Sequence, residues 1–169
     1  AEADSRACTL PDQPAGSLYY RSVGLLMARH GAYVLGAKAG CNDDSHNHND
    51  TGSVTLYKNG QPFLIDIGVE NYTKKTFSPQ RYEIWTMQSQ WHNLPTFGTV
   101  QQLPGREYCA RAVHTALDAD HSSISMDIAG AYPPVPGMSF YHRSVRLDAE
   151  GLVLEDETDY PSPVTMTLM

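Results

Sequence analysis

The residues best suited to chemistry lie in a short polar run, residues 40–50, in which most side chains can donate or accept a hydrogen bond. The run contains two histidines, His46 and His48, separated by one residue. If the segment is extended, this spacing places both imidazoles on one face. Because imidazole is both a common metal ligand and a general base near neutral pH, the pair predicts a metal site, a catalytic base, or both. Taken in isolation, the pair is also compatible with two ordinary loop histidines.

A lone carboxylate, Asp66, follows within the otherwise apolar run 63–67. Burying a carboxylate is unfavourable unless a cation or hydrogen bonds compensate for the lost hydration. An Asn-Gly dipeptide separates this run from residues 53–58, and this dipeptide between two strand-like runs predicts a two-residue hairpin turn. Such a turn places Asp66 opposite Ser53, five residues after His48. The carboxylate is therefore expected near the histidine pair.

A further histidine, His92, lies between a tryptophan and an asparagine. Two histidines and one carboxylate, with a fourth position open to water or substrate, form a normal zinc-binding set. We therefore predict a metal site that includes the histidine pair, Asp66 and His92. The side chains available to orient such ligands are Asn47, Asn49, Asp50 and Asn93. Taken singly, Asp66 can also be a solvated carboxylate at a hairpin edge, and His92 a core histidine.

The elements that must position these residues are strands, because no apolar repeat of helical period is sustained over three turns. We expect strands over residues 23–28, 32–39, 53–58, 61–67, 83–88, 108–117, 122–129, 139–147, 152–155 and 164–169, and loops over 11–14, 40–50 and 132–137. Strands joined by short turns predict an all-β fold, an antiparallel sandwich or barrel, with residues 1–169 as a single domain. The last run has a strand pattern that stops abruptly, which indicates a chain cut from a longer protein.

Composition limits the class of protein. The chain has 169 residues, of which 41% are hydrophobic and 18% charged, as in a globular domain. A net charge of −7 without a Lys/Arg cluster argues against nucleic acid as a partner, and no apolar run approaches the roughly 20 residues that span a membrane. No signal peptide is visible at the first residues. The three cysteines, Cys8, Cys41 and Cys109, are odd in number and widely spaced, so we expect ordinary thiols, with one disulfide as the alternative.

Five motifs in this order resemble the heparinase II/III-like lyases, which include heparin and heparan sulfate lyases and related alginate lyases. They are Ser-His-Asn-His-Asn-Asp-Thr-Gly-Ser at 45–53, Leu-Ile-Asp-Ile-Gly at 64–68, Tyr-Thr at 72–73, Arg-Tyr at 81–82 and Gln-Ser-Gln-Trp-His-Asn at 88–93. The resemblance implies a multi-sheet antiparallel β-sandwich that follows an N-terminal α/α toroid, with the active site in the cleft between them. No helical domain is present in these 169 residues, so the resemblance implies a fragment truncated at both ends.

The resemblance also assigns roles to residues. His48, Asp66 and His92 match positions that hold a structural zinc ion, His46 matches a catalytic histidine, and Tyr82 matches a tyrosine that lines the active site in some members. Such lyases cleave uronic-acid-containing polysaccharides by β-elimination, in which a base removes the C5 proton and the C4 leaving oxygen is protonated. The catalytic tyrosine and the asparagine that neutralises the carboxylate come from the helical domain, so this chain alone is expected to bind zinc without turning over substrate.

Two further side chains are candidates for substrate binding. The planar guanidinium of Arg81 suits a carboxylate or sulfate, although a structural ion pair explains it equally well. Trp91 is a candidate to stack on a sugar ring, whereas Trp85 is expected in the core. The expected partners are an acidic polysaccharide or oligosaccharide and the helical domain of the same protein. Polymer-degrading lyases of this type are often periplasmic, so we expect a periplasmic or secreted protein, with a cytoplasmic one as the alternative.

Two other functions fit parts of the pattern. The spacing from Gly40 to His46 and His48 fits the start of a cupin motif, which would predict an iron or manganese enzyme, but Gly52 and Ser53 stand where a cupin has its glutamate. A non-catalytic carbohydrate-binding β-sandwich is the other alternative. Release of unsaturated uronates by a protein that includes the helical domain would distinguish a lyase from both.

Overall fold

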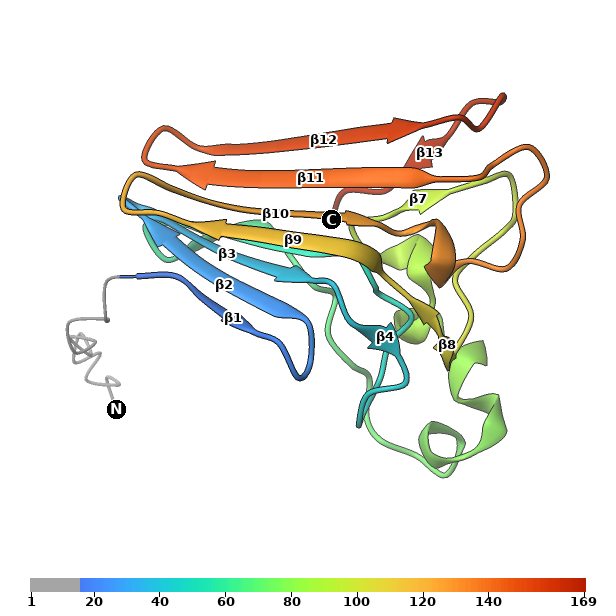
Figure 1. The fold of residues 1–169 in the computed structure, drawn as a ribbon. Coiled ribbons are helices and arrows are strands. Elements are labelled where there is room, and N and C mark those ends of the chain that lie inside the picture. Colours follow the sequence, from blue (N-terminus) through green and yellow to red (C-terminus); the bar gives the residue numbers. More distant parts are fainter. Residues whose placement is uncertain (1–15) are drawn as a thin grey trace, which may run out of the picture.

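Two antiparallel sheets packed face to face form the body of the computed structural model, which describes residues 16–169 (Figure 1). The first sheet has the order β1 (Leu18–Tyr20), β2 (Leu25–His30), β3 (Tyr33–Lys38), β5 (Val54–Lys58) and β6 (Gln61–Leu64). The second has the order β12 (Leu152–Thr158), β11 (Tyr141–Asp148), β10 (His121–Asp127) and β9 (Arg111–Leu117). The predicted all-β, multi-sheet antiparallel sandwich is confirmed.

Two smaller sheets and a series of short helices lie at one end of the sandwich (Figure 1). The small sheets pair β4 (Cys41–Asn42) with β8 (Gly105–Cys109) and β7 (Pro95–Thr96) with β13 (Thr165–Met166). The short helices are of the 3-10 type: η1 (Lys75–Phe77), η2 (Pro79–Glu83), η3 (Trp85–Met87), η4 (Ser89–Trp91) and η5 (Ala129–Ala131). Within residues 16–169, no helix has the length and apolar character needed to cross a membrane.

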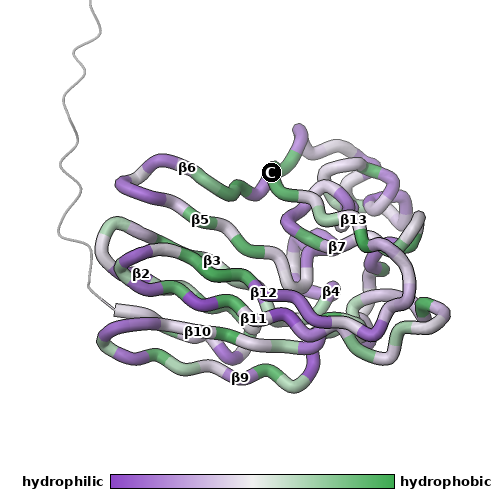
Figure 2. Tube along the Cα trace, turned by 90° about the horizontal axis from the view of Figure 1, so that it is seen from above, coloured by the Kyte–Doolittle hydropathy of each residue, from purple (hydrophilic) through white to green (hydrophobic). Residues whose placement is uncertain are grey.

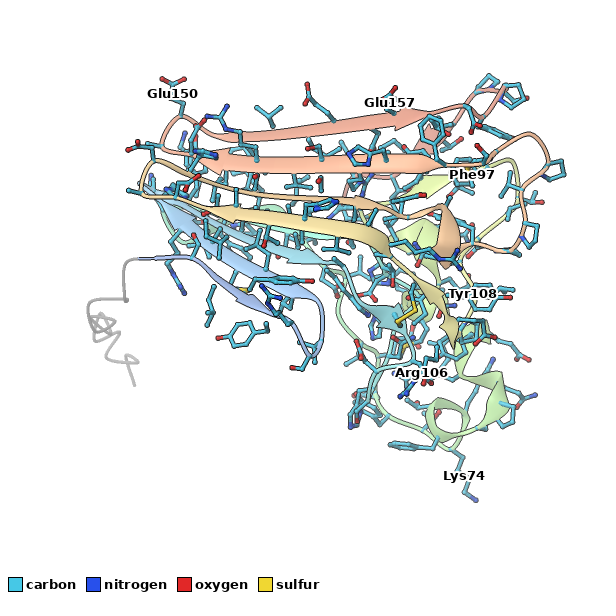
Figure 3. The ribbon with its side chains drawn as sticks, in the orientation of Figure 1. Lys74, Phe97, Arg106, Tyr108, Glu150 and Glu157 are labelled. Atoms are coloured by element: carbon cyan, nitrogen blue, oxygen red, sulfur yellow. A yellow bond between two sulfur atoms is a disulfide. The ribbon has the colours of Figure 1, made fainter. Side chains whose placement is uncertain are left out.

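The core lies between the facing sheets, because successive side chains on each strand point to opposite faces. Buried and more exposed positions accordingly alternate along β10 and β11, and hydrophobic and hydrophilic residues are mixed along the strands of both sheets (Figure 2). Leu26 and Leu35 from the first sheet and Val145 from the second are fully buried. Phe97, labelled in Figure 3, packs edge-on against Tyr141 and two other tyrosines in this layer. Burial of these side chains supplies the main driving force for folding.

A buried ion pair ties the second sheet to the segments that carry the polar motifs. Arg143 on β11 is fully buried and forms two hydrogen bonds of 2.8 Å with the carboxylate of Asp156 on β12. Its Nη1 donates to the carbonyl oxygens of Gly52 and Asn93, at 2.9 and 2.8 Å. Because these hydrogen bonds are all formed, the buried guanidinium fixes the positions of the two carbonyl groups and of the Asp156 carboxylate. The loop before β5 and the segment after η4 are thereby held against the same side chain.

Most predicted strands are present, with four corrections. The strand expected at 23–28 begins at Leu25, and the run 164–169 contributes only β13. The run 108–117 is divided at Ala110, whose backbone N–H bonds to Gly40 instead of continuing the ladder. The strand expected at 83–88 is wrong, because these residues form the end of η2, the whole of η3 and the single residues that follow each of them. Their backbone N–H groups donate to carbonyls three residues earlier, which satisfies them without a neighbouring strand.

The cysteine prediction is also corrected. Cys41 on β4 and Cys109 on β8 form a disulfide, so these two are not ordinary thiols (Figure 3). The pairing follows from the fold, which places the two residues opposite each other in the ladder across 68 positions of sequence. Cys8 and the loop expected at 11–14 lie outside the described residues.

Candidate metal centre and catalytic cleft

Three of the predicted ligands lie together. One ligand atom from each of His48, Asp66 and His92 falls within a group whose members are all within 4.8 Å of one another. The rings of His48 and His92 lie 5.4 Å apart between centroids, tilted by 56°. His48 comes from the loop between β4 and β5, Asp66 from the segment after β6, and His92 from the residue that ends η4. Segments far apart in sequence thus present a compact donor set.

The orientation of His92 makes this donor set suitable for a cation. His92 is fully buried, and its Nε2 lies 3.2 Å from the carbonyl oxygen of Thr86. Because a carbonyl only accepts, Nε2 carries the proton and Nδ1 of the neutral ring presents a lone pair. That Nδ1 has no hydrogen-bond partner and faces Oδ2 of Asp66 at 3.2 Å. Two acceptors at this distance require a positive charge between them, either a second proton on the ring or a metal ion.

The separation of two of the donor atoms and the chemistry of the three side chains are compatible with zinc. Two ligands at about 2.0–2.1 Å from a tetrahedral ion lie about 3.3 Å apart, close to the separation of His92 Nδ1 and Asp66 Oδ2. A metal-binding histidine usually donates its other ring N–H to a carbonyl or carboxylate, as His92 does to the carbonyl of Thr86. Burial lowers the pKa of His48, which favours the neutral ring that a metal requires. The contact with the His92 side chain is the largest of the effects that lower the pKa of Asp66 to about 2, so this carboxylate is ionised at neutral pH.

Asp66 reaches this position by a route that differs from the predicted one. The turn pairs Lys58 with Gln61 as expected, but a one-residue irregularity then pairs Leu56 with Leu64. Since β6 ends at Leu64, Asp66 lies beyond the ladder and is not paired with Ser53. Its Oδ1 accepts the backbone N–H of the glycine two residues on, at 2.7 Å, and its Oδ2 faces His92. The prediction of a carboxylate within an apolar strand is therefore wrong, although its nearness to the histidines is observed.

His46 and His48 point toward different partners. They lie in a loop, not on a strand, so the expectation of two imidazoles on one extended face is wrong. His46 has a φ of 58°, in the left-handed region, and its side chain is exposed. Its Nδ1 lies 3.2 Å from the hydroxyl of Tyr72, and the two rings meet edge-on. His48 instead faces His92, so the loop separates a solvent-facing imidazole from a ligand-facing one.

The loop that carries the histidines joins β5 through Gly52, a position that favours glycine. Gly52 has a φ of 93°, and a Cβ at this position would lie 2.8 Å from Cγ2 of Ile128, the residue that directly follows β10 of the second sheet. Any larger residue would meet both a backbone and a packing penalty. The close approach of this loop to the second sheet therefore depends on Gly52.

The other predicted site residues mostly hold backbone and side chains around the histidines. Tyr82 accepts a hydrogen bond from Asn47 at 3.3 Å, and Arg81 donates to the carbonyl of Asn47 at 2.9 Å. Asn93 donates to the carbonyls of Val54 and Ile65, at 2.7 and 3.0 Å, which fixes the backbone next to Asp66. Asn49 donates to the carbonyl of Gln102 at 3.2 Å, and Asp50 accepts from Lys38.

Trp85 and Trp91 lie at the protein surface, and Trp91 directly precedes the candidate ligand His92. Trp91 is 38% exposed, and its ring meets that of Trp85 edge-on at 5.6 Å. Trp85 is 44% exposed and donates from Nε1 to Glu70, so its predicted core position is wrong. The two indoles form an exposed aromatic surface, which is the type of surface that can stack on sugar rings.

A pocket of about 410 Å³ opens beside the donor set. His46, His48 and Asp66 line it together with Lys38 of β3. The exposed imidazole, the ligand group and a lysine thus share one cavity. Sequence reasoning did not single out Lys38 or give Tyr72 a role, because their contacts with the loop arise only in the folded chain.

Comparison with known proteins gives one matching family and several similar solved structures. Residues 12–165 match the family model described as heparinase II/III-like, C-terminal. Heparan sulfate lyase HepC from Pedobacter heparinus is similar with a TM-score of 0.63 and 19% identity, and a mutant of it with 0.65 and 19%; both comparisons cover 88% of this chain and 22% of the other. Heparinase III is similar with a TM-score of 0.60 and 20% identity, over 83% of this chain and 22% of that one. No curated protein sequence matched.

Proposed function

Because this chain belongs to the heparinase II/III-like C-terminal domain family, we propose that it is the β-sandwich part of a polysaccharide lyase acting on heparan sulfate, heparin, alginate or a related uronic-acid polymer. The chain spans 22% of the length of the similar lyase structures. The proposal therefore assigns the complete reaction to a longer protein. Family membership also argues against the cupin alternative.

His46 is the residue of this chain that acts at the reacting sugar. It is the exposed member of the histidine pair, it lines the pocket, and it is not one of the three grouped ligands. In β-elimination a base removes the C5 proton and the C4–O bond breaks as the leaving oxygen gains a proton. His46 serves either as that base or as the partner of the uronate carboxylate, since imidazole is available in both charge states near neutral pH. Neutralising the carboxylate stabilises the charge that develops on it.

His48, Asp66 and His92 hold a zinc ion in this proposal. Zinc bound there supplies a fixed positive charge that joins the loop, the segment after β6 and the end of η4. The support is the face-to-face arrangement of His92 Nδ1 and Asp66 Oδ2, two acceptors 3.2 Å apart. These side chains thereby preorganise the loop that presents His46, a role that lowers the cost of reaching the reactive geometry. Tyr82, which accepts a hydrogen bond from Asn47 of this loop, and Trp91, which directly precedes His92, are the candidate substrate-contacting residues.

A helical domain of the same protein completes the active site. It supplies the tyrosine that protonates the leaving oxygen and the asparagine that contacts the uronate carboxylate. The present chain alone therefore binds zinc without turning over substrate. The Cys41–Cys109 disulfide supports a periplasmic or secreted location, because disulfides persist in oxidising compartments.

The observation that carries the proposal is the grouping of His48, Asp66 and His92 beside the exposed His46. The test uses the protein with its helical domain and measures ultraviolet absorbance of unsaturated uronates released from heparan sulfate, heparin and alginate. We expect His46→Ala to lower kcat at least 100-fold, the scale of a lost general base, with zinc content unchanged. His114→Ala, at an exposed position on β9, is the matched control and should keep full activity.

Zinc content provides an independent reading. Asp66→Ala should lose the metal and the activity together, whereas Glu155→Ala, at an exposed carboxylate on β12 outside the pocket, should retain zinc. Wild-type protein that binds these polymers but releases no unsaturated product would contradict the lyase and favour a carbohydrate-binding module.

A further inference from the structure

We infer that Lys38 and Arg81 are positioning residues that hold Asn47 from two sides, and thereby fix the backbone between His46 and His48. This inference rests on the proposed function, because it assigns the direction of the two imidazoles to these two cations. The proposal concerns the residue between the histidines and not the ligands themselves.

Lys38 reaches the loop from the end of β3. Its side chain is 17% exposed, and its Nζ contacts Oδ1 of Asp50 at 2.5 Å, Oδ1 of Asn47 at 3.3 Å and Oδ2 of Asp44 at 3.8 Å. These three partners lie before, between and after the two histidines. Both backbone groups of Lys38 also bind the end of the loop, through Ser53 and Gly52. One lysine therefore connects β3 to the whole length of the loop.

Arg81 reaches the same residue from η2. Its Nε donates to the backbone carbonyl of Asn47 at 2.9 Å, and its Nη1 donates to the carbonyl of Thr76 at 3.0 Å. Its remaining nitrogen, Nη2, is buried. These contacts turn the guanidinium toward the backbone, which favours the structural one of the two roles expected from sequence over a bidentate contact with a substrate anion.

Asn47 joins the two contacts. It is 5% exposed; its Oδ1 accepts from Lys38, its backbone carbonyl accepts from Arg81, and its Nδ2 donates to Tyr82. The residue before it, His46, has the left-handed φ of 58°, which a non-glycine residue adopts only when its surroundings compensate for the strain. The backbone N–H of Asn47 also donates to the carbonyl of Asp44 at 3.1 Å, which closes a turn that contains His46. One imidazole then faces the pocket and Tyr72, and the other faces the metal ligands.

The rival explanation is that Lys38 binds the anionic substrate, since it lines the pocket. Its contacts with Asp50 and Asp44 argue for positioning, because they offset the charge that an anion would need. The two roles make different predictions. A positioning residue acts on the metal site and on the rate of the chemical step, whereas a substrate-binding residue acts on KM alone.

The test uses the protein with its helical domain and the variants Lys38→Met and Arg81→Met. Zinc affinity is measured without substrate, by competition with a chromogenic chelator, and kcat and KM with heparan sulfate. We expect each variant to lose roughly tenfold in zinc affinity, the low end of the range for residues that orient metal ligands. We also expect kcat to fall several-fold and KM to stay within twofold of the wild-type value. Lys58→Met, at a lysine on the far end of β5 that lies over Tyr33, is the matched control and should change none of the three.

Unchanged zinc affinity with a raised KM would overturn the inference in favour of substrate binding. Should Lys38→Met fail to fold by circular dichroism, Asp50→Asn weakens the same contact while keeping a polar side chain, and it must lower zinc affinity in the same direction. Absence of turnover in the wild type would count against the lyase proposal only, because zinc affinity is read without substrate.

Discussion

The hydroxyl of Tyr72 lies 3.2 Å from Nδ1 of His46, with the two rings edge-on and 5.8 Å apart between centroids. Tyr72 also stacks on Phe77 at 5.6 Å, which restrains its ring. When the tyrosine donates this hydrogen bond, the neutral imidazole carries its proton on Nε2; when it accepts, Nε2 is the free base. In both cases Tyr72 determines which nitrogen of His46 faces the pocket.

Tyr72→Phe tests this relationship. The substitution retains both ring contacts and removes only the hydroxyl. A hydrogen bond of this kind contributes about 1 kcal/mol, so we expect kcat of the protein with its helical domain to fall about fivefold. The rate constant comes from initial rates of unsaturated uronate release across pH 5–9, a span of about two units either side of neutrality.

Zinc content separates this effect from structural damage. It should equal the wild-type value in Tyr72→Phe, because Tyr72 is not among the grouped ligands. Tyr57→Phe, at an exposed tyrosine on β5, should match the wild type in every measurement. Equal rates for Tyr72→Phe and wild type at all pH values would contradict the assigned role.

The disulfide provides a prediction about stability. It links Cys41, which lies just before the histidine loop, to Cys109 across 68 positions of sequence. Closing a loop of this length stabilises a protein by about 4 kcal/mol through the lost entropy of the unfolded chain. We therefore expect the double variant Cys41→Ser with Cys109→Ser to lose about that much in free energy of unfolding, measured by urea denaturation.

Reduction supplies the control for this experiment. A reducing agent should lower the stability of the wild type to that of the double variant and leave the variant itself unchanged. If reduced and oxidised wild-type protein unfold at the same urea concentration, the disulfide does not contribute in this way.

The donor set was predictable from sequence because it depends on residue chemistry. Asp66 stands out among apolar neighbours, and the histidine pair stands out within a polar run, whatever the exact path of the backbone between them. The predicted path itself was wrong in register, because a one-residue irregularity in β6 has no signature in the sequence. Proximity survived this error because Gly68 and His92 together hold the carboxylate beyond the strand.

Contacts between distant segments could not be predicted in the same way. Lys38 is an ordinary strand residue until the loop folds over it, and the partner of Cys41 depends on which strands become neighbours. The short helices between residues 75 and 91 were read in part as a strand, because a few alternating residues fit a 3-10 turn as well as a strand. Trp85 was predicted in the core because residues 83–88 were read with the alternating pattern of a strand.

A carboxylate far from the metal centre provides the pH prediction. Asp159 accepts hydrogen bonds from the hydroxyl of Ser139 at 2.6 Å, from its backbone N–H at 2.9 Å and from the backbone N–H of Phe140 at 3.3 Å. These bonds, the one from the Ser139 side chain first, lower the pKa of Asp159 below its ordinary 3.8. A lowered folded-state pKa adds stability above the ordinary pKa, and this stability is lost as the pH falls through the folded-state value.

Asp159→Asn should therefore be less stable than the wild type at pH 7, and the difference should shrink as the pH is lowered below about 4. The measurement is the urea midpoint of both proteins at a series of pH values, at constant salt. Ser139→Ala removes the strongest of the bonds, so it should show the same pH dependence with a smaller amplitude. A difference between Asp159→Asn and wild type that stays constant down to about pH 3 would mean that the ionised carboxylate is not what Ser139 and Phe140 stabilise.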